Sequence, residues 1–181
     1  LARGQYLVFL DPDDLIDAEV IEKMLLKLRL YERNPESKVA FVYPAVVHFK
    51  DDPERPLSIE RSRYDRKGLL KENFIPSFAL ISRNLYLMMG GMCEDRIKYF
   101  EDYDFWLRLA TFGYKGVLLD EPLFYYRRHA RGRSTKIKES VTDWKEELKR
   151  NNLLAFNGDT AEWDVPKEMV PCWRPIPDMG I

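Results

Sequence analysis

The 181-residue sequence predicts an α/β fold with a mixed, mostly parallel sheet flanked by helices. Short runs of β-forming apolar residues alternate with segments whose apolar positions recur at helical spacing. Near the start of the chain the order is strand, acidic loop, helix, strand, which is the order of a βαβ unit with parallel strands. Hydrophobic residues make up 45% of the chain, which is enough apolar material for a packed core.

The first predicted strand covers residues 5–10, an apolar run that is typical of a strand buried on both faces. It ends at residues 11–14 (DPDD), because a proline and three carboxylates do not continue a sheet. Asp17 is the predicted N-cap of the following helix, and the Asn-Pro pair at 34–35 ends it. Residues 39–43 form the second predicted strand.

The rest of the predicted elements follow from the same patterns. Residues 50–67 carry many charges of both signs, which predicts an exposed loop or a solvent-facing hairpin. Residues 105–112 have the spacing of a helix, and Gly113 follows directly where a helix commonly ends. Two short strands are predicted at 117–119 and 123–126, separated by a proline.

The chain has the size of one domain. We expect residues 1–155 to form it and residues 156–181 to be a proline-rich tail, because proline interrupts regular structure. The formal net charge of −1 is unlike that of nucleic-acid-binding proteins, so no nucleic-acid partner is expected. No run approaches the ~20 apolar residues of a membrane span, and no signal peptide is recognisable. We therefore expect a cytoplasmic protein.

Asp11 and Asp13 form the first candidate functional group. Because they follow a strand at i, i+2 spacing, both carboxylates can converge on one hard cation while a diphosphate completes its coordination. Mg²⁺ and Mn²⁺ suit such oxygen ligands. The turn also has a purely structural explanation, because one of its carboxylates can cap the following helix.

Glu101, Asp102 and Asp104 form the second group and precede the predicted helix. Backbone N–H groups and the helix dipole favour negative charge at a helix start, so a carboxylate there can be held ionised as a general base. Helix capping is again the alternative explanation. The third group is His129, a possible ligand of a metal or phosphate, preceded by Arg127 and Arg128, which could neutralise a pyrophosphate. A surface histidine in a basic loop is the alternative there.

In their order along the chain, these groups resemble the motifs of family 2 glycosyltransferases of the GT-A fold. Residues 2–14 (ARGQYLVFLDPDD) are similar to the family's strand and D-x-D segment. Residues 100–108 (FEDYDFWLR) are similar to its E-D-x-D block, and residues 122–129 (PLFYYRRH) to its Y-R-x-H segment. The resemblance implies an inverting enzyme that moves a sugar from a nucleotide-diphospho-sugar donor to a hydroxyl group.

The resemblance also implies roles on the donor side of the reaction. Asp13 would bind a divalent cation, Mn²⁺ or Mg²⁺, that bridges the two donor phosphates. Asp11 would contact the nucleotide ribose or help to hold the metal. His129 would complete the metal or pyrophosphate shell, with Arg127 and Arg128 beside it as donor-binding residues.

On the acceptor side, Asp102 would be the general base that takes the proton of the attacking hydroxyl group. Glu101 and Asp104 would be supporting residues that contact the acceptor. Many members of the family build polysaccharides or modify lipid-linked acceptors, so a saccharide or lipid-linked acceptor and peripheral membrane association are compatible with the sequence. We expect Asp13, Asp102 and His129 to line one cavity.

Members of this family begin with a nucleotide-binding half, which has no counterpart in this sequence. We therefore expect the chain to be the C-terminal part of a GT-A catalytic domain, a partial fold without its N-terminal nucleotide-binding half. The strand at residues 5–10 would then lack a neighbour and expose apolar surface. A truncated, non-catalytic remnant that binds a nucleotide or a carbohydrate is the alternative function.

Overall fold

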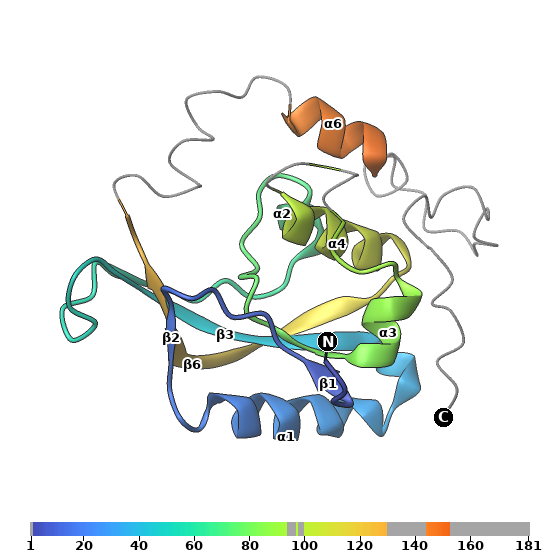
Figure 1. Ribbon diagram of the computed structural model, residues 1–181. Coiled ribbons are helices and arrows are strands. Elements are labelled where there is room, and N and C mark those ends of the chain that lie inside the picture. The colour runs from blue at the N-terminus through green and yellow to red at the C-terminus, as the bar shows by residue number, and fades with distance from the viewer. Residues whose placement is uncertain (1, 94–96, 98–99, 130–143, 153–181) are drawn as a thin grey trace.

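The computed structural model describes residues 2–93, 97, 100–129 and 144–152. The strands are β1 (Tyr6–Leu7), β2 (Leu15–Ile16), β3 (Val39–Phe49), β4 (Ser58–Glu60), β5 (Leu80–Ser82) and β6 (Lys115–Arg127). The helices are α1 (Val20–Glu32), α2 (Arg66–Leu69), α3 (Arg83–Met88), α4 (Glu101–Thr111) and α6 (Trp144–Asn151), with a short 3-10 helix η1 (Pro35–Ser37). In Figure 1, α1 lies below a curled sheet, and α2, α4 and α6 lie above it.

The sheet has six strands in the order β1-β5-β3-β6-β2, with β4 paired to β3. It is mixed and mostly antiparallel, so the prediction of a mostly parallel sheet is wrong. Only β3 and β6 pair in parallel among the described strands, while β1–β5, β2–β6, β3–β4 and β3–β5 are antiparallel. The two strands expected as a βαβ pair, β1 and β3, do run in the same direction. However, β5 lies between them and pairs antiparallel with both.

The first predicted strand is much shorter than expected. Of residues 5–10, only Tyr6 and Leu7 belong to the sheet, and both are half-buried at its edge. The prediction that this strand is buried on both faces is therefore wrong. Leu10, just beyond the strand, is 45% exposed, in keeping with the expected exposure of apolar surface.

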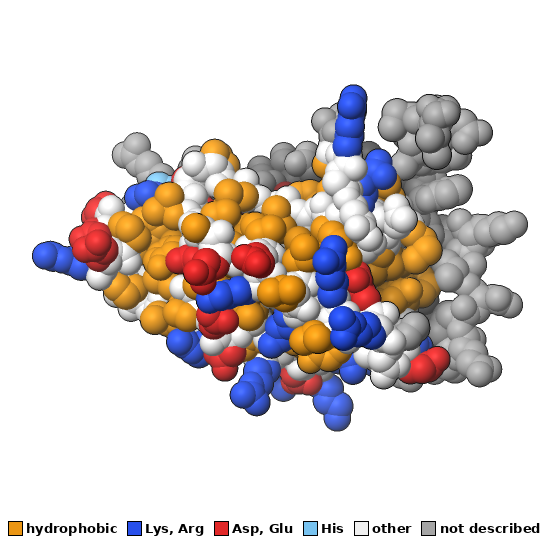
Figure 2. Space-filling model, turned by 90° about the horizontal axis from the view of Figure 1, so that it is seen from below, with side chains coloured by type: hydrophobic (Ala, Val, Ile, Leu, Met, Phe, Trp, Pro, Cys, Tyr) orange, Lys and Arg blue, Asp and Glu red, His pale blue; other side chains and the backbone are white. Residues whose placement is uncertain are grey.

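Helix α1 begins at Val20, so the prediction of Asp17 as its N-cap is wrong. Asp17 Oδ1 instead accepts a hydrogen bond from the N–H of Glu19, the residue directly before the helix, at 2.9 Å. The helix ends before the Asn-Pro pair, as predicted. Its inner face is buried at Val20, Met24 and Leu28, which recur one turn apart. Figure 2 shows the face that carries α1, where hydrophobic side chains lie among charged ones.

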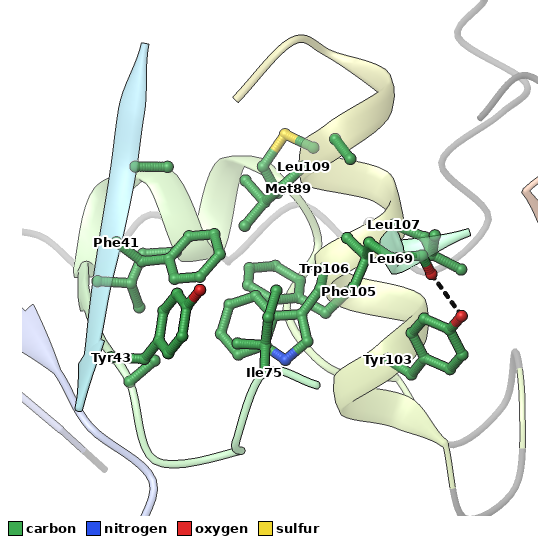
Figure 3. Packing of buried hydrophobic residues seen from close by; sticks show 14 of the residues in the cluster. Phe41, Tyr43, Leu69, Ile75, Met89, Tyr103, Phe105, Trp106, Leu107 and Leu109 are labelled. Atoms are coloured by element: carbon green, nitrogen blue, oxygen red, sulfur yellow. Dashed lines mark hydrogen bonds between the residues drawn. The ribbon is translucent and has the colours of Figure 1, made fainter. Parts of the chain in front are cut away.

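Strand β3 is the centre of the core because its side chains alternate between two apolar clusters. Phe41, Tyr43 and Ala45 pack on the side of α4, whereas Val42 and Val46 pack on the side of α1. Phe41 stacks on Trp106 of α4 with 4.5 Å between ring centroids. Figure 3 shows this cluster, together with a hydrogen bond from the Tyr103 hydroxyl to the carbonyl of Leu69 at 2.5 Å. These contacts fix α4 on the sheet and α2 beside its first turn.

Other predicted elements are confirmed with changed bounds. Residues 50–57 join β3 and β4, which confirms a solvent-facing hairpin. Helix α4 already begins at Glu101, and Gly113 follows it with a φ of +76°, a conformation that suits glycine. The two strands predicted around Pro122 are one strand, β6, whose pairing register with β3 shifts on both sides of Pro122.

No helix in the described part of the chain is long and apolar enough to cross a membrane. Helix α6 is the last described element, and the tail at 156–181 falls outside the described residues. The division into a domain and a tail therefore stays a prediction.

Candidate functional site

The acidic turn at residues 11–14 lies against the end of β6. It leads into β2, which pairs with β6 at Leu15 and Tyr125, and Figure 1 shows β2 beside β6. His129 Nε2 lies 2.9 Å from Asp13 Oδ2, although the two residues are 116 positions apart in the sequence. The structure therefore brings together the predicted metal-binding residues of two separate motifs.

The Asp13 and His129 side chains are open to solvent, with 45% and 47% exposure, so a ligand can reach both. A carboxylate oxygen and an imidazole nitrogen are both accepted by Mn²⁺. The described residues contain no group of three or more His, Cys, Asp or Glu side chains that could hold a metal ion. A cation held by this pair could take further ligands from a bound molecule and from water.

Asp14 is a buried carboxylate that the sequence analysis did not assign to a role. Its Oδ1 accepts the backbone N–H of Arg127 at 2.9 Å, while its Oδ2 is buried with no hydrogen-bond partner in the described structure. Burial raises the pKa of Asp14 to about 6, and the neighbouring carboxylates of Asp13 and Asp11 act in the same direction. No signal in the sequence separates it from the adjacent Asp13, because its burial depends on the packing of β6. Asp11 itself is exposed.

Arg127 holds the acidic turn in place. Its Nε donates to the backbone carbonyl of Asp13 at 3.0 Å, and its Nη1 donates to the carbonyl of Lys50 at 3.1 Å. The guanidinium carbon lies 4.4 Å from the centre of the Phe49 ring. Together with the backbone bond to Asp14, these contacts tie the turn to β6 and to the end of β3.

Arg128 is exposed and makes different contacts. Its Nε donates to His48 Nδ1 at 3.1 Å, and its guanidinium carbon lies 5.0 Å from the centre of the Tyr126 ring. Within the described residues, its two Nη groups have no hydrogen-bond partner. Arg128 is therefore a better candidate than Arg127 for binding an anion, because Arg127 uses its Nε and Nη1 within the protein. The assignment of both arginines as donor-binding residues stays a prediction.

Asp102 lies in the first turn of α4, because the helix begins four residues earlier than the predicted Phe105. Its Oδ1 accepts the Tyr103 N–H at 2.7 Å, and its Oδ2 accepts from Asn73 Nδ2 at 3.2 Å. Burial raises the pKa of Asp102 to about 6, and the charge of Glu101 adds to this effect. A half-buried carboxylate with such a pKa is a stronger base than an ordinary aspartate and is still ionised at neutral pH. The role of Glu101 stays a prediction.

Asp104 is fully buried in an ion pair. Its Oδ2 accepts from Arg108 Nε at 2.9 Å and its Oδ1 from Asn152 Nδ2 at 2.8 Å. Arg108 also donates to the backbone carbonyls of Met89 and Gly91. Asp104 thus joins α4 to Asn152, directly after α6. Through Arg108, it also joins α4 to the segment from Met89 to Gly91. These contacts give it a structural role, and its predicted contact with the acceptor is untested.

The structure joins only part of the predicted site directly. Asp13 contacts His129, whereas Asp102 contacts Asn73 and its own helix. The expectation that Asp13, Asp102 and His129 line one cavity stays a prediction. The sequence analysis missed Asp14, Asn73 and His48, whose roles depend on contacts between distant segments.

Comparison with known proteins identifies two distant homologues. The chain is 29% identical over 147 residues to an uncharacterised glycosyltransferase of Haemophilus influenzae, which covers 78% of this chain and 48% of that protein. It is 26% identical over 133 residues to an uncharacterised glycosyltransferase of Methanocaldococcus jannaschii, covering 70% of this chain and 43% of that protein. No protein-family model matches the chain.

These similarities make the chain glycosyltransferase-like by distant homology. The chain spans about half the length of the curated relatives that it matches, 48% and 43%. Membership of family 2 and the GT-A fold stays a resemblance carried by the motifs.

Proposed function

We propose that this chain is part of a glycosyltransferase that moves a sugar from a nucleotide-diphospho-sugar to a hydroxyl group with inversion. The observation that carries the proposal is the 2.9 Å contact between Asp13 and His129 in a chain with glycosyltransferase relatives. This contact brings together the D-x-D segment and the Y-R-x-H segment, both predicted to bind the donor, at an exposed place. Arg128, a candidate for binding an anion, directly precedes His129. The resemblance to GT-A enzymes supplies the inverting stereochemistry.

On the donor side, the leaving group is a nucleoside diphosphate, so negative charge grows on its oxygen during the reaction. Asp13 and His129 would hold Mn²⁺ or Mg²⁺, and a bound cation supplies charge that stabilises this leaving group. Arg128, the residue before His129, would add a positive charge, and its Nη groups have no hydrogen-bond partner among the described residues. Charges fixed where the leaving group develops its charge stabilise the transition state more than the ground state.

On the acceptor side, Asp102 would take the proton from the attacking hydroxyl group. Sugar hydroxyl groups are weak nucleophiles, and a positioned base contributes roughly 10²–10⁴-fold to the rate. The hydrogen bond from Asn73 at 3.2 Å orients the Asp102 carboxylate. A pKa of about 6 leaves Asp102 ionised at neutral pH and still able to accept a proton.

The test measures sugar transfer from a panel of nucleotide-diphospho-sugars with Mn²⁺. It uses this chain and the longest gene product that contains it. We expect Asp102→Asn to lower kcat by roughly 10²–10⁴-fold, and Asp13→Ala to abolish the dependence on Mn²⁺. Asp51→Asn, at an aspartate with 87% side-chain exposure in the β3–β4 loop, is the matched control and should change neither quantity.

Two results would reject this mechanism. Transfer that both Asp102→Asn and Asp13→Ala leave unchanged would exclude the roles proposed for these residues. Manganese-dependent binding of nucleoside diphosphates without any turnover would instead identify the non-catalytic binding protein that is the alternative function.

A further inference from the structure

His48 lies in a line of hydrogen bonds that crosses the sheet from β4 through β3 to the end of β6. Its Nε2 lies 3.1 Å from Glu60 Oε2, and its Nδ1 lies 3.1 Å from Arg128 Nε. The second oxygen of Glu60 accepts from Ser62 Oγ at 3.0 Å. The His48 side chain is only 10% exposed, and its ring packs edge-on against the Tyr126 ring. Both ring nitrogens are therefore engaged in a buried place.

The neighbours of His48 select one tautomer. A guanidinium Nε carries a proton in every state of arginine, so the His48 nitrogen that faces it, Nδ1, must accept and carry none. Nε2 then carries the ring proton and donates it to Glu60. This hydrogen bond is the main cause that lowers the pKa of Glu60, which keeps its carboxylate an acceptor. Glu60 thus fixes the proton on the far side of the ring.

The consequence for Arg128 is a fixed side chain with unused donors. His48 binds its Nε, the Tyr126 ring lies against its guanidinium, and its Nη groups have no hydrogen-bond partner in the described structure. The neighbouring His129 contacts Asp13. An exposed arginine normally samples many rotamers, and a ligand that binds it must order it at an entropic cost.

We propose that His48 is a positioning residue that holds Arg128 ready for the diphosphate of the donor. Its Nδ1 accepts the Arg128 Nε–H and leaves both Nη groups, one residue before His129, available to phosphate oxygens. Glu60 supports this arrangement by fixing the tautomer of His48. The inference rests on the proposed function, because it takes the diphosphate of that reaction as the ligand.

The experiment measures the binding of inorganic pyrophosphate with Mn²⁺ by calorimetry on the 181-residue chain. This probe carries no base or sugar, so it does not depend on the identity of the donor. His48→Phe removes both ring nitrogens at a similar size. His48→Asn keeps an oxygen near the position of Nδ1 for Arg128, and His48→Gln keeps an amide N–H near Nε2 for Glu60.

We expect His48→Phe to weaken pyrophosphate binding about fivefold, the effect of one net hydrogen bond. His48→Asn should restore most of the affinity, and His48→Gln should not. Arg128→Ala should weaken binding about tenfold, and adding His48→Phe to it should cause no further loss. Ser58→Ala, which faces His48 across the β3–β4 pair, is the control and should bind like the wild type.

Thermal melting of each variant separates positioning from misfolding, because His48→Asn should restore affinity even at a lowered melting temperature. Unchanged pyrophosphate affinity in His48→Phe would overturn the positioning role. So would an equal loss of affinity when His48→Phe is made in the wild type and in Arg128→Ala. Neither result would bear on the proposed sugar transfer. Failure of the wild type to bind pyrophosphate would overturn the positioning role as well. The expected His48 dependence without sugar transfer would support the positioning role and reject the transferase.

Discussion

The acidic turn at 11–14 and the acidic helix start at 101–104 look alike in the sequence, but the structure holds them in different ways. In the turn, Asp14 is buried and one of its oxygens has no hydrogen-bond partner among the described residues, and Asp13 next to it is open to solvent. In the helix, Asp104 is buried in an ion pair, and Asp102 is held by an amide. Each segment therefore has one carboxylate that anchors it and one that is available for chemistry.

The difference lies in how the anchoring charge is compensated. Asp104 has a guanidinium and an amide for its two oxygens, so both oxygens are hydrogen-bonded in the interior. Asp14 has one backbone N–H for two oxygens, and its pKa is raised to about 6. The helix segment is anchored by an ion pair, whereas the raised pKa of Asp14 makes the anchor of the turn depend on pH.

The largest expected effect is the loss of the buried ion pair between Asp104 and Arg108. Asp104→Ala leaves Arg108 buried at 8% exposure without its carboxylate, which should lower the free energy of unfolding by about 3–5 kcal/mol. Asp13→Ala, at the half-exposed carboxylate of the turn, should change it by less than about 0.5 kcal/mol. Denaturant titration of both variants measures the two values. Similar losses would show that the two segments do not differ as described.

The second effect concerns the pH dependence of stability. The folded state raises the pKa of Asp14 from 3.8 to about 6, so folding favours its protonated form. The contribution of Asp14 to stability is therefore lost as pH rises from about 4 to about 6. Relative to the wild type, Asp14→Asn should gain about 1–2 kcal/mol on going from pH 4 to pH 7.

Denaturant titrations at both pH values measure this gain. Asp17→Asn, an acidic residue in the neighbouring Asx turn whose Oδ1 accepts from Glu19, is the control and should show no comparable gain. A constant difference between Asp14→Asn and the wild type at both pH values would contradict a raised pKa at Asp14.

The sequence predicted features that local patterns determine. Gly113 marked the end of α4, and the Asn-Pro pair at 34–35 marked the end of α1. The contact of Asp13 with His129 also agrees with the order of the motifs. In contrast, the insertion of β5 between β1 and β3 depends on a three-residue strand, which carries almost no signal of its own.

Other parts of the site could not be predicted, because they depend on which atoms meet across the fold. The bond from Asn73 to Asp102 joins segments 29 positions apart, and that from Arg128 to His48 joins segments 80 apart. Asp14 and Asp13 are adjacent acids, and only the packing of β6 decides which of them is buried. Residue type therefore located the acidic segments but did not assign their roles.

The smallest expected effect is a shift in the pKa of Asp102, the proposed general base. Deprotonation converts Asp102 to the form that accepts a proton, so the rate of transfer should rise with pH through about 6. Asn73 donates to the charged carboxylate and so lowers its pKa. Asn73→Ala should therefore move the midpoint of this rise to higher pH by roughly half a unit.

The rate is measured against pH in the wild type and in Asn73→Ala, and again with Asp14→Asn in both. The second pair separates the titration of Asp102 from that of Asp14, which has a similar pKa. Asn34→Ala, at an exposed asparagine after α1, is the control and should leave the midpoint in place. Two results would assign the titrating base to the acidic turn instead of the helix start. One is a midpoint that Asn73→Ala moves to lower pH, and the other is a midpoint that only Asp14→Asn changes.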